Sequence, residues 1–337
     1  MEKDEGGYRQ INKSLNIGAF EDYLESQTAH LLPLADVEQC SLRILRVLGQ
    51  NPGKFTLQGT NTYIIGTGHD RVMIDTGGGS PAWAELVAAA LKQHNVKLSH
   101  VLLTHWHGDH TGGVSDLLRL YPDLRGSIYK HTPDSGQQVI ADNQIFSVPG
   151  ATIRAVHSPG HSEDHMCFVL EEESAMFTGD NILGSGTSAV EDLAIFMDSL
   201  LKMQGQGCQI GYSAHGSTIA DLPAKIAQEL AAKMRRERRV MQTLQKLRQT
   251  EGPITVKELV AHMFGNGVDK EVAGQVLEPF MDEVLRKLAA DGKVAFEKRR
   301  GVKKWFSLAS PKGNDVAAVS RLACSNPVRS APLIGAF

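Results

Sequence analysis

Six consecutive residues near the middle of the chain, His105-Trp106-His107-Gly108-Asp109-His110, place three imidazoles and one carboxylate within about one turn's length. The apolar run Val101–Thr104 precedes them directly and predicts a buried strand. Imidazole and carboxylate groups bind divalent zinc, and a loop at the end of a strand can direct several of them to one point. The fold must therefore present metal-binding side chains at the end of a buried strand. A polar loop that is rich in histidine by chance is the weaker interpretation.

Three further candidate ligands follow downstream, namely His161, Asp180 and His215. Each lies beside Gly or Pro after a hydrophobic stretch, such as the strand-like Ala151–Val156 ahead of His161. A lone histidine of this kind is more often an ordinary loop or core residue than a ligand. Together with the first cluster, however, the three residues predict a common pocket at the ends of several strands.

This order of motifs, His-x-His-x-Asp-His, then Gly-His, Gly-Asp and a late His-Gly, resembles the metallo-β-lactamase superfamily of binuclear metal hydrolases. The resemblance implies two sets of ligands that share one carboxylate. They are His105, His107 and His161 for the first metal, Asp109, His110 and His215 for the second, and Asp180 bridging both. It implies two zinc ions per chain, although manganese or iron can replace zinc with such nitrogen and oxygen ligands.

Longer phrases narrow the resemblance to the lactamase-beta-like group, which includes a mitochondrial endoribonuclease and fungal polyketide-pathway thioesterases. These phrases are Asn51–Tyr63, Ile74–Gly77, Thr104–Gly113 and Gly179–Leu183. Other phrases resemble the fungal set itself, the atrochrysone carboxyl ACP thioesterases. They are Gly6–Asn12, Ala19–Tyr23, Gly126–Tyr129, His165–Phe168 and Leu277–Phe280. The resemblance covers about residues 6–308.

The resemblance implies an α/β fold, the metallo-β-lactamase αββα sandwich. It implies a metal-dependent thioesterase that hydrolyses the bond between an acyl carrier protein and an aromatic polyketide of the atrochrysone carboxylic acid type, releasing the product of a non-reducing polyketide synthase. Release by ring-closing condensation and cleavage of single-stranded RNA stay open as alternatives. A scaffold without catalysis is a third, which the complete ligand set weighs against. The chain lacks a Gly-x-Ser-x-Gly motif, so a serine-hydrolase route has no support.

Two of the expected ligands are also predicted to act in the chemistry. A pair of metals can share one water and lower its pKa. Asp180 is expected to orient this nucleophile and Asp109 to accept its proton. His165 is expected to support a ligand or to face the substrate, because the seven-ligand set is complete without it. Asn61 lies in a turn that the family places near the site, or else satisfies local backbone.

One departure concerns the loop before the last ligand. The family usually has Pro-Gly ahead of the late His-Gly, whereas this chain has Ser213-Ala214. The ligand His215 is kept, so the expected metal assignment stands. The shape of that loop is left open.

Bulk composition restricts the partners. The chain has 337 residues, of which 42% are hydrophobic and 22% charged, and its net charge is -3. No global field therefore draws it to nucleic acid or to an anionic membrane, and no stretch approaches the roughly 20 apolar residues of a spanning helix.

The N-terminus lacks a basic region and an apolar run, so we expect no secretory signal. Four cysteines without paired spacing predict reduced thiols and a cytoplasmic protein.

Changes in pattern divide the chain into four parts. We predict an N-terminal extension at 1–40, with a short helix around 20–24, and a catalytic domain at 41–221, where short strands alternate with helices. Residues 222–308 predict helices at 224–250, 255–264 and 276–290 followed by a hairpin around Arg300-Gly301, an order similar to a winged-helix module. Residues 309–337 predict a disordered tail.

Basic residues cluster at 233–239 and 298–304. Acidic residues interleave with basic ones along the predicted helices of this region, and no row of aromatic residues accompanies the basic clusters as in proteins that bind single strands. Solvated helix and wing faces are therefore a better interpretation than nucleic-acid binding. Docking of an acidic acyl carrier protein stays open.

Overall fold

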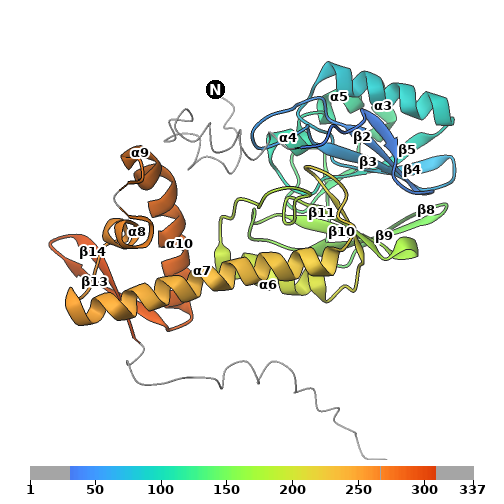
Figure 1. Ribbon diagram of the computed structural model, residues 1–337. Helices are drawn as coiled ribbons and strands as arrows, with labels where there is room; N and C mark the ends of the chain where they lie inside the picture. Colours follow the sequence, from blue (N-terminus) through green and yellow to red (C-terminus); the bar gives the residue numbers. More distant parts are fainter. Residues whose placement is uncertain (1–30, 266, 309–337) are drawn as a thin grey trace, which may run out of the picture.

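The computed structural model describes residues 31–265 and 267–308 (Figure 1). The helix expected around 20–24 and the tail at 309–337 lie outside these residues. The described chain contains two mixed sheets that pack face to face with helices on their outer faces, so the predicted αββα sandwich is confirmed. We call this part the sheet lobe.

The first sheet has seven strands in sequence order, with antiparallel pairs from β1 to β4 and parallel pairs from β4 to β7. Short runs of branched and aromatic residues form these strands, as is typical of buried strands. The strands are β1 (Val37–Gln39), β2 (Ile44–Leu48), β3 (Asn61–Ile65), β4 (Asp70–Ile74), β5 (Lys97–Leu102), β6 (Ile128–Lys130) and β7 (Gln138–Val139).

The second sheet has five strands in the order β12-β11-β10-β9-β8. Only the β11–β12 pair is parallel. The strands are β8 (Ile145–Val148), β9 (Ala151–His157), β10 (Met166–Leu170), β11 (Ala175–Gly179) and β12 (Ile210–Ser213).

Three apolar layers hold the sheet lobe together. Residues such as Ile65, Phe168 and Phe177 fill the space between the sheets. Helices α3 (Pro81–His94) and α5 (Val114–Leu120) cover the outer face of the first sheet around the fully buried Trp83. Helix α6 (Leu193–Gln204) and the start of α7 (Leu222–Thr250) cover the second sheet.

The strand directions bring the candidate ligands to one edge of the sandwich. β5 and β4 are parallel, as are β11 and β12, and β9 runs in the same direction as β11 because both are antiparallel to β10. The carboxyl ends of parallel strands meet at the same edge. The backbone hydrogen bond from the Met166 N–H to the Thr104 carbonyl oxygen joins the two sheets at this edge, so the loops after β5, β9, β11 and β12 converge. All seven candidate ligands follow these four strands.

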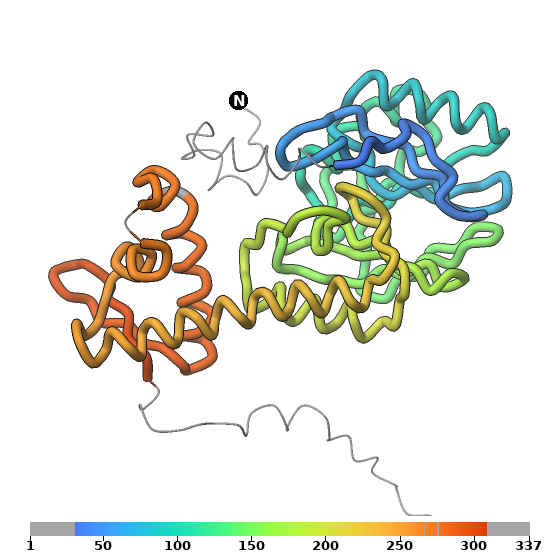
Figure 2. Tube along the Cα trace, viewed as in Figure 1, coloured from blue at the N-terminus to red at the C-terminus, as the bar shows by residue number. Residues whose placement is uncertain are grey.

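Helix α7 continues beyond the lobe into a second structural unit, as the tube in Figure 2 shows. Its first half contributes Ile226 and Leu230 to the core of the second sheet, and its second half contributes Val240 and Leu244 to another core. This second core also includes α8 (Val256–Phe264), α10 (Glu278–Ala290) and the hairpin of β13 (Val294–Arg299) and β14 (Val302–Ser307). We call α8 to β14, with the second half of α7, the C-terminal module.

Most elements of the C-terminal module match the sequence prediction. α8 carries the expected capping box of Thr255 and Glu258, and Arg300 and Gly301 have positive φ at the hairpin turn. The helix expected at 276–290 begins at Glu278 as α10. A short helix, α9 (Lys270–Val272), and a π-helical turn at 273–277 precede it. The winged-helix identity and the domain boundaries stay predictions. No helix within 31–265 and 267–308 is both long and apolar enough to cross a membrane.

Candidate metal centre

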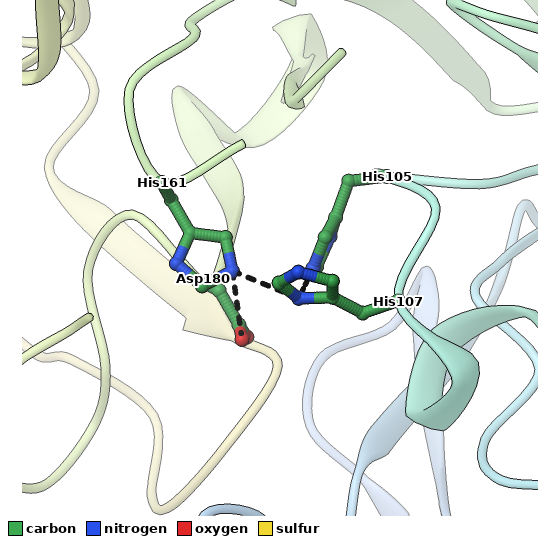
Figure 3. Close-up of side chains that lie close together, drawn as sticks. All are labelled: His105, His107, His161 and Asp180. Atoms are coloured by element: carbon green, nitrogen blue, oxygen red, sulfur yellow. Dashed lines mark hydrogen bonds and ion pairs between the residues drawn. The ribbon is translucent and has the colours of Figure 1, made fainter. Parts of the chain in front are cut away.

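The first group of candidate ligands consists of three imidazoles and one carboxylate (Figure 3). His105 Nε2 lies 2.7 Å and His161 Nε2 lies 3.1 Å from His107 Nδ1. Asp180 Oδ2 lies 3.5 Å from His161 Nε2. All four residues are buried, so their nitrogen and oxygen atoms converge on a small space away from bulk water.

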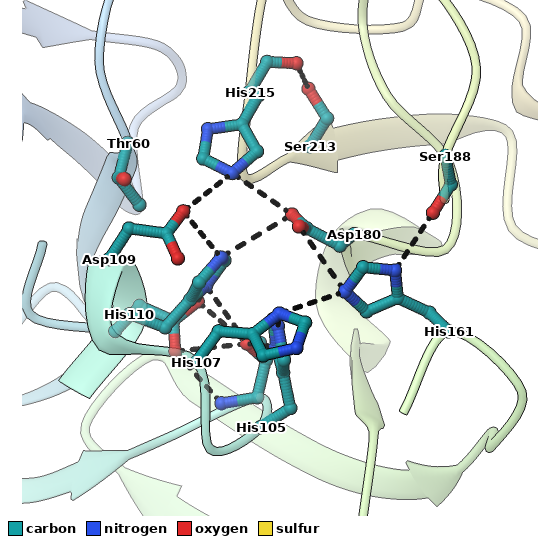
Figure 4. Close-up of polar contacts among 12 residues, drawn as sticks. Thr60, His105, His107, Asp109, His110, His161, Asp180, Ser188, Ser213 and His215 are labelled. Carbon is teal, nitrogen blue, oxygen red and sulfur yellow. Dashed lines mark hydrogen bonds and ion pairs between the residues drawn. The ribbon is translucent and has the colours of Figure 1, made fainter. Parts of the chain in front are cut away.

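The second group contains Asp109, His110 and His215 (Figure 4). Asp109 Oδ2 lies 3.3 Å from His110 Nε2 and 3.2 Å from His215 Nε2. Asp180 Oδ1 lies 3.5 Å and 3.2 Å from the same two nitrogens. The two oxygens of Asp180 thus face different groups, as expected of a residue that bridges two metals.

Asp75 and Thr104 support this cluster, and sequence reasoning gave neither of them a role. Asp75 Oδ2 accepts a hydrogen bond from His110 Nδ1 at 2.8 Å, while its Oδ1 accepts one from the Thr104 backbone N–H at 2.8 Å. The Thr104 hydroxyl lies 2.9 Å from His105 Nδ1. With Nδ1 of His110 occupied as a donor, its Nε2 lone pair is directed at the candidate site.

His161 is oriented by a segment far along the chain. Its Nδ1 donates to the Ala189 carbonyl oxygen at 2.8 Å and lies 3.0 Å from the Ser188 hydroxyl. This donation leaves Nε2 as the nitrogen with the free lone pair. Residues 184–192, which we call the strap, therefore form one wall of the site.

Asn61 and His165 hold the ligand loops. The Asn61 amide donates to the carbonyl oxygens of Ser213 and Gly216 at 3.0 and 2.8 Å, so it ties the His215 loop to β3 and not to its own turn. His165 Nε2 accepts a hydrogen bond from the Asp180 backbone N–H at 3.1 Å, and His165 is fully buried. These contacts favour a supporting role for both residues over contact with substrate.

Burial and neighbouring charges shift the pKa values in opposite directions across the cluster. Burial lowers the pKa of His107 to about 3 and also lowers the pKa values of His105 and His161. Burial acts in the same direction on His215, but the Asp180 and Asp109 carboxylates outweigh it and raise that pKa to about 9. Burial raises the pKa of Asp109, and the charge of His110 reverses this and holds it below its usual range. These shifts favour neutral imidazoles at His105, His107 and His161, whereas opposite charges stabilise the second group.

The donor set fits divalent cations. Asp180 Oδ1 and His110 Nε2 are buried, and among the described residues they contact other candidate ligands at 3.2–3.5 Å without forming a hydrogen bond of normal geometry. Unsatisfied buried atoms of this kind cost free energy, which a cation bound between them would offset. Nitrogen and carboxylate oxygen ligands suit zinc and similar ions. A metal would thus be held by the two groups, with Asp180 in contact with both.

Comparisons with known proteins agree with the family resemblance of the sequence motifs. The family model described as metallo-beta-lactamase superfamily matches residues 55–239. An atrochrysone carboxyl ACP thioesterase of Aspergillus terreus is 63% identical over 308 residues, which cover 89% of this chain and 96% of that protein. A protein of the same name from Claviceps purpurea is 63% identical over 309 residues, covering 91% of this chain and all of that protein.

A solved structure supports the fold. A beta-lactamase domain protein from Burkholderia ambifaria superposes with a TM-score of 0.66 over 83% of this chain and 96% of that chain, at 18% identity. At this identity the likeness concerns the fold alone.

Proposed function

Because the chain belongs to the metallo-β-lactamase superfamily, we propose that it is a metal-dependent acyl carrier protein thioesterase. Its substrate is the thioester between a carrier protein and an aromatic polyketide of the atrochrysone carboxylic acid type, presented by a non-reducing polyketide synthase. The observation that carries this proposal is the cluster of two ligand groups joined by Asp180, in a chain 63% identical to proteins named for that activity.

We further propose two zinc ions per chain, held by the seven residues His105, His107, Asp109, His110, His161, Asp180 and His215. Cations in these positions would supply Lewis acidity, polarising a thioester carbonyl and lowering the pKa of a water molecule. Manganese is the main alternative, because it accepts the same donor types. A cytoplasmic location, expected from the cysteines, also stays a proposal.

Exposure separates Asp109 from the other six ligands. Its side chain is 22% exposed, whereas no other is more than 3% exposed. This exposure supports the proposal that substrate and solvent reach the cluster from the Asp109 side and that the Asp109 carboxylate accepts a proton from the attacking water. A new carbon–oxygen bond forms at the carbonyl carbon, the carbon–sulfur bond breaks, and the sulfur leaves with a proton as the thiol of the carrier arm.

The experiment compares two substrates for the purified chain, an acyl carrier protein thioester and an acyl-pantetheine thioester, with and without a chelator. We expect free acid from both, loss of activity with chelator, and recovery when zinc is added. Elemental analysis is expected to give close to two metals per chain. A cleavage rate equal to the spontaneous rate in every arm contradicts the proposal, and a cyclised product in place of the acid shows ring-closing condensation.

A further inference from the structure

Two arginines on α7 lie against aromatic rings of the C-terminal module. The Arg236 guanidinium lies 4.0 Å from the centre of the Phe280 ring of α10, and the Arg239 guanidinium lies 5.4 Å from that of Phe264 of α8. Both rings are more than a third exposed. We call these four residues the arginine face. Helices α8 and α10 lie on the same side of α7 in Figure 1, and the two arginine–ring contacts join α7 to each of them.

The arginine face carries uncompensated positive charge. The nearby carboxylates of α7 are already paired: Glu229 contacts Lys225 and Lys233, and Glu237 contacts Lys287. Neither Arg236 nor Arg239 forms an ion pair with a carboxylate among residues 31–265 and 267–308. Arg239 instead donates to the carbonyl oxygen of Met263, which fixes its position. Two oriented guanidinium groups without a counter-ion are suited to bind an external anion.

The same flank of α7 leads to the metal centre. Lys225, Ala232, Arg236 and Arg239 are separated by intervals that place them along one side of a helix. Lys225 Nζ donates to the carbonyl oxygen of Gly186 in the strap at 3.3 Å. The strap in turn orients His161. Arg236 follows Lys225 by eleven residues, or about 16 Å along the helix axis.

α10 also contacts the end of the strap. The backbone N–H of Leu193, which directly follows the strap, donates to Glu283 at 3.0 Å. Leu193 is buried in the core of the C-terminal module. The arginine face and the strap that forms the wall of the candidate metal site are thus joined by direct contacts of α7 and α10 with the strap and with Leu193 at its end.

We propose that the arginine face docks the carrier protein that delivers the thioester, by binding the anionic phosphodiester at the base of its pantetheine arm and the acidic surface around it. This inference rests on the proposed function and adds the site of partner recognition. A carrier-linked thioester has such a phosphodiester at the opposite end of the arm from the reacting carbonyl. An arm anchored at Arg236 extends along the strap to the ligand cluster.

The geometry favours a carrier protein over single-stranded RNA. Proteins that bind single strands stack successive bases on exposed aromatic rings. Here Arg236 and Arg239 each lie over one face of Phe280 and Phe264, so these two rings orient guanidinium groups and do not form a row of stacking surfaces for successive bases. One compact anion is the better match.

The test reverses the charge of the face and uses a matched control on the same helix. The variant is Arg236→Glu with Arg239→Glu, and the control is Arg235→Glu with Arg238→Glu, which makes the same charge change at exposed positions outside the face. The readout is the ratio of kcat/KM for the carrier-linked thioester to kcat/KM for the acyl-pantetheine thioester. We expect this ratio to fall about tenfold in the variant, through KM, and to stay at the wild-type value in the control.

A second measurement does not depend on folding of the variant. In the wild-type chain, KM for the carrier-linked thioester is expected to rise with ionic strength, while KM for acyl-pantetheine stays constant, because salt screens the charge contact. An unchanged ratio in the variant, an equal fall in the control, or a flat salt dependence overturns the docking site. A variant that keeps its activity on the carrier-linked thioester but loses binding of single-stranded RNA also overturns the docking site. A wild-type chain that cleaves neither thioester refutes the proposed function instead.

Discussion

The sheet lobe and the C-terminal module bury different kinds of side chain. At the edge of the sheet lobe, six of the seven candidate metal ligands and their polar supports, including Asp75 and Thr104, are buried, and only Asp109 is partly exposed. The module core is apolar, with residues such as Val240, Leu285 and Trp305. Buried polar groups require partners and carry chemistry, whereas buried apolar groups mainly stabilise the fold. Substitutions in the two regions are therefore expected to affect different quantities.

The largest effect is expected from Asp180→Ala. This change removes the carboxylate that faces both ligand groups. Metal catalysis supplies several kcal/mol of transition-state stabilisation, so kcat/KM for the acyl-pantetheine thioester is expected to fall at least ~1000-fold. Elemental analysis should show less metal per chain, while circular dichroism stays near that of the wild type.

Asp198→Ala, on an exposed position of α6, is the control and is expected to keep full activity. Near-normal turnover in Asp180→Ala would show that the cluster is not the reaction centre. The proposed division of roles between the two regions would then fail.

A large loss of stability without loss of chemistry is expected from Leu285→Ala in the module. Leu285 is fully buried, and removing such a side chain leaves a cavity, so the free energy of unfolding is expected to fall by about 3 kcal/mol. Urea denaturation measures this change. At a temperature where the variant is folded, kcat/KM for acyl-pantetheine is expected to stay within about twofold of the wild type.

Val302→Ala, in the same module but about half exposed, is the control for Leu285→Ala. Its effect on the free energy of unfolding is expected to stay below about 0.5 kcal/mol, as for most surface substitutions. Equal losses in the two variants would contradict an apolar core that carries the stability of the module.

The two regions were also predictable from different signals. The spacing of His105, His107 and Asp109 predicts the candidate metal site without any hydrophobic periodicity, because metal coordination restricts the residue types that can serve as ligands. The module followed from hydrophobic periodicity, and its capping box and hairpin turn appeared where expected. The family resemblance, not periodicity, supplied the αββα architecture.

The features that the sequence did not indicate depend on contacts between distant segments. Asp75 and Thr104 are ordinary residues at strand ends, and only the packing of β4 beside β5 brings their hydrogen bonds to the ligands. The tie from Asn61 to the His215 loop spans more than 150 residues of the chain, so local turn chemistry suggested a different partner. The π-helical turn before α10 likewise has no signal in the periodic pattern.

An intermediate effect is expected from His165→Ala. His165 accepts a hydrogen bond from the Asp180 backbone, and loss of such support typically costs about 10–100-fold in metal affinity or activity. Competition with a chelator of known affinity measures the change. KM for the thioester is expected to stay constant, since His165 is fully buried.

His165→Gln provides the matched test, because a glutamine side chain keeps an acceptor for the Asp180 backbone N–H. Partial recovery of metal affinity is expected. A higher KM with unchanged metal affinity would instead place His165 against the substrate, which is the other role that the sequence allowed.

The smallest effect is expected from Thr255→Ala at the start of α8. The Thr255 hydroxyl accepts a hydrogen bond from the Glu258 backbone N–H, and loss of an N-cap of this kind costs about 1 kcal/mol. Thr255→Ser keeps the hydroxyl and is expected to retain most of the stability in urea denaturation. Both variants should hydrolyse acyl-pantetheine at the wild-type rate, because α8 lies in the module and carries none of the candidate metal ligands. If hydrolysis fell in proportion to stability, the metal centre would depend on the integrity of the module, and the two regions would have to be treated as one cooperative unit.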